Sequence, residues 1–411
     1  MPSRLTIVIL VDHGYVSGGQ SKVAIESALG LKSAGARVIF FCATGPLDPR
    51  LGAAGVEAIS LDQPDILSNP SRAKAAIQGT WNAPAVTALE TLLAGLPRDN
   101  TLIHVHGWAK ALSPAIALPL RAAKLPAVYT MHEYFLHCPN GGFYDYQKHA
   151  VCNLKPMSPA CWATHCDSRN YPFKLWRNAR LFIAQHVARL ADVFADFVLI
   201  SDLQEQLLKP CLPKGARVSR VVNPIEAEPL GHKNAPASGD FIFVGRLSAE
   251  KGAFLFAEAA EKAGVTPVFI GDGPVADELA QRFPRATLLG WKSPPQVREA
   301  MRAARALVFP SLWYEGQPLT VQESMALGTP VLVSDICAAR EQIADGESGL
   351  LFKGGDAESL AGALRRAADD ALIARLSPAA YDAYWRDPPT LQRHIAETLQ
   401  VYERALARRN A

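Results

Sequence analysis

Continuous apolar runs, each followed by a stretch with helical periodicity, are the main pattern of the first half of the chain. The run LTIVILV at residues 5–11 is rich in β-branched residues and does not alternate with polar ones, which is typical of a strand buried on both faces of a parallel sheet. A glycine pair, a helical stretch (SKVAIESALGLKSAG) and a second strand (ARVIFFCAT) follow it. With further strands predicted at 101–107, 127–133 and 196–201, this half predicts a doubly wound α/β domain.

The same rhythm restarts after residues 224–239, a segment rich in Pro, Gly and Ala that we interpret as a linker. Strands are predicted at DFIFVGR, TPVFIGDG, ATLLGW, ALVFPS, PVLVSD and GLLF, and a helix over 253–263. The sequence thus predicts an α/β protein with two Rossmann-like doubly wound domains, at 1–223 and 240–377, that face a central cleft. Residues 378–411 are predicted to form helices that pack back toward the N-terminal domain.

Composition and charge narrow the class of protein. The 411 residues are 49% hydrophobic and 20% charged, which excludes disordered, collagen-like and coiled-coil chains and suggests two or three domains. The net charge of +3 is too small for a surface built throughout to bind nucleic acid, and no nucleic-acid partner is expected. Residues 1–223 hold 22 basic and 15 acidic side chains, whereas residues 224–411 hold 20 and 24. An anionic partner is therefore expected at the N-terminal half.

Targeting and membrane signals are weak along the chain. Every apolar run of 18 or more residues is interrupted by charge or proline, so no transmembrane helix is predicted. No small-residue cleavage site follows the first apolar run, which we expect to be a strand rather than a signal peptide. A cytoplasmic location is expected, with peripheral association at the inner face of the plasma membrane as a further expectation.

The second half carries residues suited to a diphosphate. In FVGRLSAEKG a predicted strand ends at a glycine and is followed by Arg246 and Lys251, so that two cations and the N–H groups of a turn are available to phosphate oxygens. Solvated loop cations are the alternative interpretation. GDGP at 271–274 predicts a tight turn after the next strand, where a planar ring can approach the backbone.

Two carboxylates, Glu315 and Glu323, lie seven residues apart in SLWYEGQPLTVQESMALGTPVLVSD. Gly316 and Pro318 are expected to start a helix whose N-terminal N–H groups face the cleft, with Glu323 about two turns along it. The carboxylates would then accept hydrogen bonds from the hydroxyls of a sugar or a ribose. A solvated position on the helix is the alternative.

These segments, followed by ALGTPVLVSD and DGESGLLF, occur in an order that resembles the nucleotide-binding domain of family 4 retaining glycosyltransferases. This family has two Rossmann-like domains (the glycosyltransferase B-type fold) and serves bacterial polysaccharide assembly. GG at 18–19 and TMHEY at 130–134 resemble its first glycine loop and its histidine segment. The resemblance covers nearly the whole chain. It implies retaining transfer of a hexose-type sugar from a nucleoside-diphosphate sugar to a glycan or lipid-linked glycan acceptor.

The resemblance also implies roles for individual residues. Arg246 and Lys251 would bind the donor diphosphate and neutralise the leaving group. Glu315 would hold sugar hydroxyls and His132 would contact the donor sugar near the reacting carbon, which completes the predicted catalytic set. The predicted donor-binding residues are Arg246 and Lys251 together with Gly18, Gly19, Gly271, Gly273, Trp291, Gly316, Gln317, Pro318, Leu319 and Glu323.

On the acceptor side we expect His106 and Tyr134. The chain departs from the family's usual EGFG with EGQP, in which Pro318 removes one backbone N–H donor. No catalytic metal is expected, because two cations supply the charge stabilisation and the sequence has no Asp-x-Asp pair. A sugar-nucleotide epimerase or hydrolase on the same fold and a catalytically silent binding subunit are the alternative functions.

A cysteine-rich insertion is predicted at 137–170. A structural zinc site of four thiolates would hold this long polar loop together, and its predicted ligands are Cys138, Cys152, Cys161 and Cys166. Buried or free thiols and disulfides are the alternatives.

A basic and aromatic stretch follows the insertion. Its cations are Arg169, Lys174, Arg177, Arg180 and Arg189, and its apolar residues are Tyr171, Phe173, Trp176, Leu181 and Phe182. This pattern predicts an element that lies on an anionic membrane surface. A helix that buries its aromatic residues against the sheet is the alternative.

Overall fold

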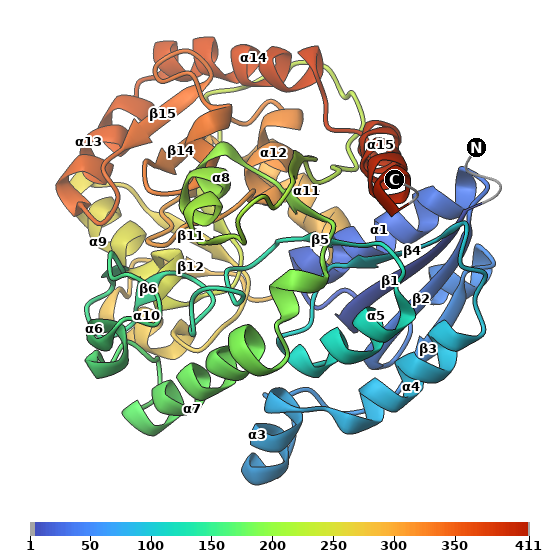
Figure 1. Ribbon diagram of the computed structural model, residues 1–411. Coiled ribbons are helices and arrows are strands. Elements are labelled where there is room, and N and C mark those ends of the chain that lie inside the picture. The colour runs from blue at the N-terminus through green and yellow to red at the C-terminus, as the bar shows by residue number, and fades with distance from the viewer. Residues whose placement is uncertain (1–4, 410–411) are drawn as a thin grey trace.

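Two parallel sheets form the framework of the computed structural model, which describes residues 5–409 (Figure 1). In spatial order, the first sheet contains β3 (Glu57–Ser60), β2 (Arg37–Thr44), β1 (Thr6–His13), β4 (Thr101–Val105), β5 (Ala127–Thr130), β8 (Asp196–Leu199) and β9 (Val218–Arg220). The second contains β12 (Thr287–Leu288), β11 (Pro267–Ile270), β10 (Phe241–Val244), β13 (Ala306–Phe309), β14 (Val331–Ser334) and β15 (Gly349–Phe352). Neighbouring strands pair in parallel throughout both sheets, so the predicted pair of Rossmann-like α/β domains is confirmed.

Helices connect the strands on both faces of each sheet. Those of the first domain are α1 (Gly19–Ser33), α2 (Pro49–Ala53), α3 (Arg72–Thr80), α4 (Ala83–Ala94), α5 (Ala117–Ala123), α6 (Pro159–Ala163), α7 (Tyr171–Phe182) and α8 (Asp202–Leu208). Those that follow are α9 (Ala253–Ala263), α10 (Ala276–Arg282), α11 (Pro294–Ala303), α12 (Leu319–Ala326), α13 (Ala357–Ala367), α14 (Asp370–Arg386) and α15 (Leu391–Arg409). Between β5 and α7, the cysteine-rich segment contains a short antiparallel hairpin of β6 (Tyr144–Asp145) and β7 (Ala150–Val151).

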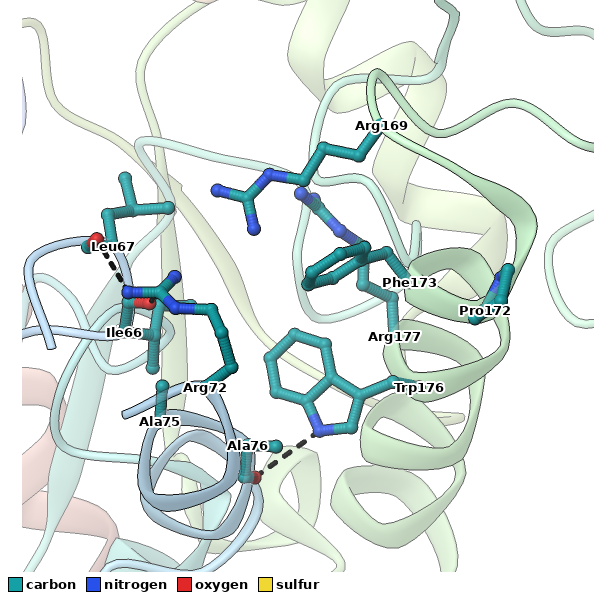
Figure 2. Close-up of a pocket in the computed structure, with 10 residues that line it drawn as sticks. All are labelled: Ile66, Leu67, Arg72, Ala75, Ala76, Arg169, Pro172, Phe173, Trp176 and Arg177. Carbon is teal, nitrogen blue, oxygen red and sulfur yellow. Dashed lines mark hydrogen bonds between the residues drawn. The ribbon is translucent and has the colours of Figure 1, made fainter. Parts of the chain in front are cut away.

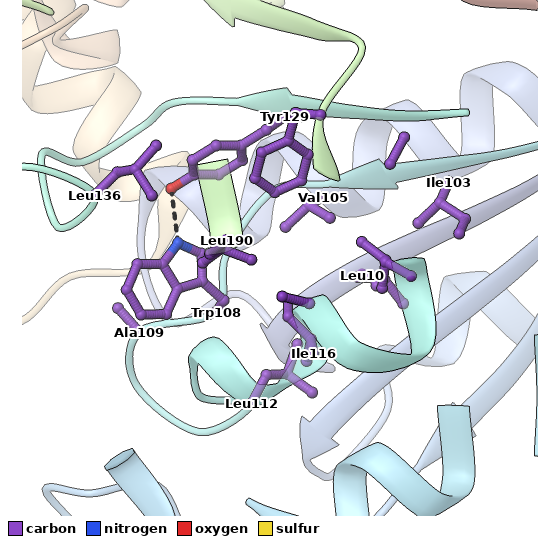
Figure 3. Packing of buried hydrophobic residues seen from close by; sticks show 14 of the residues in the cluster. Leu10, Ile103, Val105, Trp108, Ala109, Leu112, Ile116, Tyr129, Leu136 and Leu190 are labelled. Carbon is purple, nitrogen blue, oxygen red and sulfur yellow. Dashed lines mark hydrogen bonds between the residues drawn. The ribbon is translucent and has the colours of Figure 1, made fainter. Parts of the chain in front are cut away.

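The apolar run that predicted the first strand lies at the centre of the first sheet. All eight residues of β1 are buried, because helices cover both faces of that sheet. On one face, Leu10 packs in a cluster with Ile103, Val105 and Trp108 (Figure 3). The indole Nε1 of Trp108 donates a hydrogen bond to the hydroxyl of Tyr129 at 3.2 Å, which satisfies the polar atom of a fully buried ring.

The last helix, α15, returns to the first domain and packs on α1 (Figure 1). A Cβ on Gly30 of α1 would lie 2.6 Å from Ile395 Cγ1, so the two helices meet where one has no side chain. The hydroxyl of Tyr402 lies 2.6 Å from His104 Nδ1 in β4, and His394 Nε2 lies 2.9 Å from Ser27 Oγ. The chain therefore crosses between the domains twice, after β9 and after α14.

Candidate functional site

Lys251 and Glu315 lie together beyond the carboxyl ends of two adjacent strands, β10 and β13. Gly252 allows this arrangement: its φ is +77°, and a Cβ there would lie 2.0 Å from the carbonyl oxygen of Pro310. The Lys251 ammonium forms an ion pair with Glu315 Oε1, to which the indole Nε1 of Trp313 also donates at 2.6 Å. The ammonium lies 5.4 Å from the centre of the Trp313 ring. The predicted diphosphate cation and the predicted sugar-binding carboxylate are thus paired with each other.

Arg246, the second predicted diphosphate cation, is exposed and forms no ion pair with any residue in the described range. It lies near Tyr146 of the cysteine-rich insertion. Burial raises the pKa of this phenol to about 12, with a further contribution from Glu250, whereas Arg177 and Arg246 act to lower it. One predicted cation is therefore held by a carboxylate, and the other is available to an anion.

The glycines of GDGP serve the packing of two loops. Gly271 has a φ of +134°, and a Cβ there would lie 2.0 Å from the carbonyl oxygen of Gly245. A Cβ on Gly273 would lie 2.2 Å from the carbonyl oxygen of Leu247. These contacts fix the turn against the loop that carries Arg246, and they give both glycines a structural reason independent of a ligand. Trp291 is 74% exposed after β12, and a contact of any of these three residues with the donor stays a prediction.

The segment Gly316–Pro318, which leads into α12, contacts the first domain. A Cβ on Gly316 would lie 3.0 Å from Ile200 Cδ1. The side chain of Gln317 is buried and accepts a hydrogen bond from the Asn223 N–H at 2.7 Å, so this amide ties the loop to the chain segment between the domains. Pro318 precedes the first residue of α12, where a missing N–H costs no hydrogen bond within the helix.

The N-terminal end of α1, which follows the first glycine loop, lies against α12 of the second domain, which carries Glu323. Lys22 Nζ lies 3.1 Å from Glu323 Oε1, and both side chains are partly exposed. A Cβ on Gly19 would lie 3.8 Å from Leu319 Cδ1, whereas one on Gly18 would meet no atom within 4 Å. The structure thus brings together the first glycine loop and the carboxylate predicted to bind a ribose. Sequence reasoning missed Lys22, although its position in the first turn after GG is a usable signal.

Three histidine rings, those of His104, His106 and His132, lie close together in the first domain. The rings of His106 and His132 lie 5.4 Å apart, with Nδ1 of the first 3.1 Å from Nε2 of the second. Burial lowers the pKa of His132 to about 3 and that of His106 and His104 well below the ordinary value. His132 is therefore neutral at physiological pH, and any contact that it makes with a sugar is a hydrogen bond rather than a charge interaction. His106 Nε2 is buried and has no hydrogen-bond partner among the described residues.

The cysteine-rich insertion of the first domain packs against the second domain. A Cβ on Gly142 would lie 2.5 Å from Cε3 of Trp313, the residue whose indole holds Glu315. Tyr134 is buried with an unbonded hydroxyl, and burial together with the Glu315 charge raises its pKa. The insertion thus forms part of the wall around the Lys251–Glu315 pair. The contribution of Trp313 and Tyr146 could not be found from the sequence, because no motif marks either residue.

The predicted zinc site of Cys138, Cys152, Cys161 and Cys166 stays a prediction. Within residues 5–409, no group of three or more His, Cys, Asp or Glu side chains is arranged to hold a metal ion. All four cysteines are free thiols, and the fully buried Lys174 lies among them with Nζ 3.6 Å from Cys161 Sγ. An ammonium beside a thiol favours the alternative of buried or free thiols.

The predicted membrane-surface stretch is only partly exposed. Lys174, Arg180 and Leu181 are buried, and Arg180 donates from Nη1 to the Ala109 carbonyl at 2.8 Å. Phe182 is 48% exposed. The stretch, which includes α7, is therefore a helix with one face in the core and one outward face. No helix in the described part of the chain is long and apolar enough to cross a bilayer.

Comparison with known proteins agrees with this architecture. Residues 18–195 match the family model "Glycosyl transferase 4-like domain", and residues 238–370 match "Glycosyl transferases group 1". The crystal structure of Anabaena HepE in complex with UDP and glucose superposes with a TM-score of 0.65 at 19% identity, covering 97% of this chain and 100% of that one. The fold is that of the glycosyltransferase B class, and the chain belongs to the family 4 type of glycosyltransferases within it.

Two relatives differ in how much of the chain they match. The UDP-Gal:alpha-D-GlcNAc-diphosphoundecaprenol alpha-1,3-galactosyltransferase of Escherichia coli is 32% identical over 147 residues, which are 32% of this chain and 37% of that protein. The match thus spans little more than a third of the relative's length. Alpha-maltose-1-phosphate synthase of Mycobacterium tuberculosis is 27% identical over 344 residues, covering 75% of this chain and 77% of that protein.

Proposed function

We propose that the protein is a retaining glycosyltransferase that moves a hexose from a nucleoside-diphosphate sugar to a glycan or lipid-linked glycan acceptor in polysaccharide biosynthesis. The observation that carries the proposal is the pairing of Lys251 with Glu315 beside the unpaired Arg246. Family membership supports the reaction class. The E. coli relative is named for a UDP-sugar donor and a diphosphoundecaprenol-linked acceptor, which supports the donor and acceptor classes.

In this proposal the donor diphosphate competes with Glu315 for the Lys251 ammonium. Arg246 and Lys251 then stabilise the negative charge that develops on the departing phosphate, which is the main requirement of this reaction. Glu315, released from Lys251, still receives the indole N–H of Trp313 at 2.6 Å and has a second oxygen for a sugar hydroxyl. Donor binding would thus prepare the sugar subsite by the same movement that neutralises the diphosphate.

Neutral His132 and His106 would orient the reacting sugar and the acceptor through hydrogen bonds. Glu323, partnered by Lys22 at 3.1 Å, would exchange that contact for the ribose hydroxyls. Both exchanges replace contacts within the protein by contacts to the donor. We therefore expect the donor-bound protein to resist unfolding more than the free protein.

The test combines binding with turnover. Thermal shift with UDP, GDP, ADP and their glucose and galactose derivatives identifies the donor, and product formation is then measured with and without an oligosaccharide or lipid-linked acceptor. Acceptor-dependent transfer with an unchanged anomeric configuration, read by NMR, is the expected result. Conversion of the sugar nucleotide without any acceptor would favour an epimerase or hydrolase, and binding without turnover would favour a silent subunit.

A further inference from the structure

Exposed apolar side chains are frequent on two helices of the first domain and on the segments beside them. Of the ten large apolar residues that are exposed in the described chain, six lie on α3, α7 and the segments beside them: Leu67, Ile77, Tyr171, Leu175, Phe182 and Val187. The two helices lie side by side (Figure 1), and the Trp176 indole Nε1 on α7 donates to Thr80 Oγ1 on α3 at 3.2 Å. These two helices and their flanking segments thus hold most of the exposed large apolar side chains of the described chain.

A pocket of about 220 Å³ opens between α3 and α7 (Figure 2), and Leu67 is the one of these six exposed residues that lines it. We call it the α3–α7 pocket. Its apolar walls are Ile66 and Leu67 on one side and the rings of Phe173 and Trp176 on the other. Such walls fit a hydrocarbon chain.

The charged lining of the α3–α7 pocket is entirely positive: three of its ten lining residues are arginines and none is acidic. Arg72 donates to the backbone carbonyls of Ile66 and Leu67 at 3.2 and 3.1 Å, which leaves its charge without a counter-ion. Arg177 is paired with the buried Asp167 at 2.7 Å. Arg169 lies over the Phe173 ring at 4.7 Å and has no carboxylate partner in the described chain. The pocket therefore combines an apolar trough with excess positive charge.

One residue of the pocket and one of the candidate donor site both lie near Tyr146 of the insertion. Arg177 lines the pocket, Arg246 belongs to the predicted diphosphate site, and both charges act on the pKa of Tyr146. The side chain of Gln147 donates to the carbonyl of Asp167, the partner of Arg177, at 2.7 Å. The arginine side of the pocket is therefore tied to the insertion through Asp167.

We propose that the α3–α7 pocket binds the lipid-phosphate part of a lipid-linked acceptor. The hydrocarbon chain would lie against Leu67, Phe173 and Trp176, and the phosphate or diphosphate would bind Arg169 and Arg72. The inference rests on the proposed function, because it names the acceptor class of that reaction. It differs from attachment to a bilayer surface, since a single lipid molecule with its head group inside the pocket accounts for both the apolar walls and the arginines.

The experiment uses the full chain and titrates four probes by calorimetry: farnesyl diphosphate below its micelle concentration, farnesol, inorganic diphosphate, and vesicles of phosphatidylcholine with phosphatidylglycerol. Farnesyl diphosphate should bind at least tenfold more tightly than either fragment, because only it supplies both the chain and the charge. Saturating UDP should not displace it, which distinguishes the α3–α7 pocket from the donor site. UDP binding is measured separately, so failure of the proposed donor function is visible on its own.

Matched variants locate the binding. Arg169→Gln and Leu67→Ser should each weaken farnesyl diphosphate binding by roughly fivefold to tenfold, through lost charge and lost apolar contact. Two control substitutions should leave farnesyl diphosphate binding unchanged: Arg285→Gln and Leu230→Ser. Arg285 is an exposed arginine of the second domain, and Leu230 is as exposed as Leu67, at 54%. Binding that is insensitive to Arg169→Gln and Leu67→Ser, or displaced by UDP, overturns the proposal. So does binding to the anionic vesicles alone, which would identify these helices as a bilayer contact.

Discussion

The ion pair between Lys251 and Glu315 allows stability and activity to be separated by substitution. The two side chains are 27% and 12% exposed, so the pair is partly buried. Lys251→Met removes the ammonium, which lies 5.4 Å from the centre of the Trp313 ring, and keeps an unbranched apolar side chain at this position. Glu315 then keeps only the Trp313 indole at 2.6 Å and the Ser311 hydroxyl at 3.3 Å as donors. A carboxylate that loses its counter-ion in this setting is expected to destabilise the fold.

The size of the loss follows from burial. A partly buried charge that keeps two hydrogen bonds costs about 1–3 kcal/mol when its ionic partner is removed. In the double variant Lys251→Met with Glu315→Gln, the amide still accepts from the indole and no charge is left unpaired. Most of the lost stability should therefore return. Transfer activity should not return, because each single variant removes on the order of 2–4 kcal/mol of transition-state stabilisation.

Urea unfolding gives the stability of the four proteins in this cycle, and transfer from the identified donor gives kcat/KM. The expected pattern is a destabilised Lys251→Met, a nearly native double variant, and activity lowered by roughly 30-fold or more in all three variants. Native activity in Lys251→Met would refute the role of this cation. A double variant less stable than both single variants would refute the account of the pair as a buried charge balance.

Three further predictions concern other parts of the molecule. Lys22→Met should raise the affinity for the nucleoside diphosphate up to about fivefold, because it frees Glu323 from a partly exposed ion pair. Calorimetry measures this affinity, and weaker binding would indicate instead that Lys22 contacts the phosphates. Burial lowers the pKa of His137 to about 4, so the unfolded chain takes up a proton at this residue first as the pH falls below 6.5. The free energy of unfolding should therefore fall by about 2 kcal/mol between pH 7.5 and 5 through this residue. Urea unfolding at the two pH values should show a correspondingly smaller fall for His137→Gln. Gly271→Ala should lower the free energy of unfolding by about 2–4 kcal/mol, because the added Cβ meets the carbonyl oxygen of Gly245. Gly362→Ala in α13, where space is open, should raise the free energy of unfolding by up to about 1 kcal/mol. Equal effects of the two substitutions would contradict the packing role of Gly271.

The fold was accessible from the sequence where strands are buried on both faces. LTIVILV marks β1, and the helix predicted over 253–263 coincides with α9. The edge strand β3 was missed, since its four residues EAIS are at most half-buried and form no apolar run. A short edge strand is defined by its pairing with β2, and pairing is a property of tertiary structure.

The candidate site was accessible only as separate motifs. Arg246, Lys251, Glu315 and Glu323 stand in recognisable local patterns, but their partners come from distant segments. Lys22 lies 301 positions from Glu323, and the Gly142 contact with Trp313 joins an insertion to the other domain. The cysteine spacing predicts a metal site, and it gives no sign that Lys174 on the following helix lies beside Cys161.

The hydrogen bonds of the Gln317 side chain could not be predicted either, because Asn223 lies in another segment of the chain. The family resemblance implied only that Gln317 is one of the donor-binding residues. The structure uses its amide to hold Asn223, with a second hydrogen bond from Nε2 to Gln322 at 2.9 Å. Amide side chains accept and donate in many settings, so their partners cannot be deduced from residue type alone.

The return of α15 to the first domain has a consequence for synthesis of the chain on the ribosome. Ile395, Val401 and Tyr402 belong to the same apolar cluster as Ile7 and Ile9 of β1. The first sheet is complete at Arg220, but α15 begins at Leu391, about 170 residues later. At about 5–20 residues per second, the ribosome makes that intervening stretch in roughly 10–30 s. During this interval one face of α1 stays uncovered on the nascent chain, so the first domain to emerge is the one that depends on the last helix to be made.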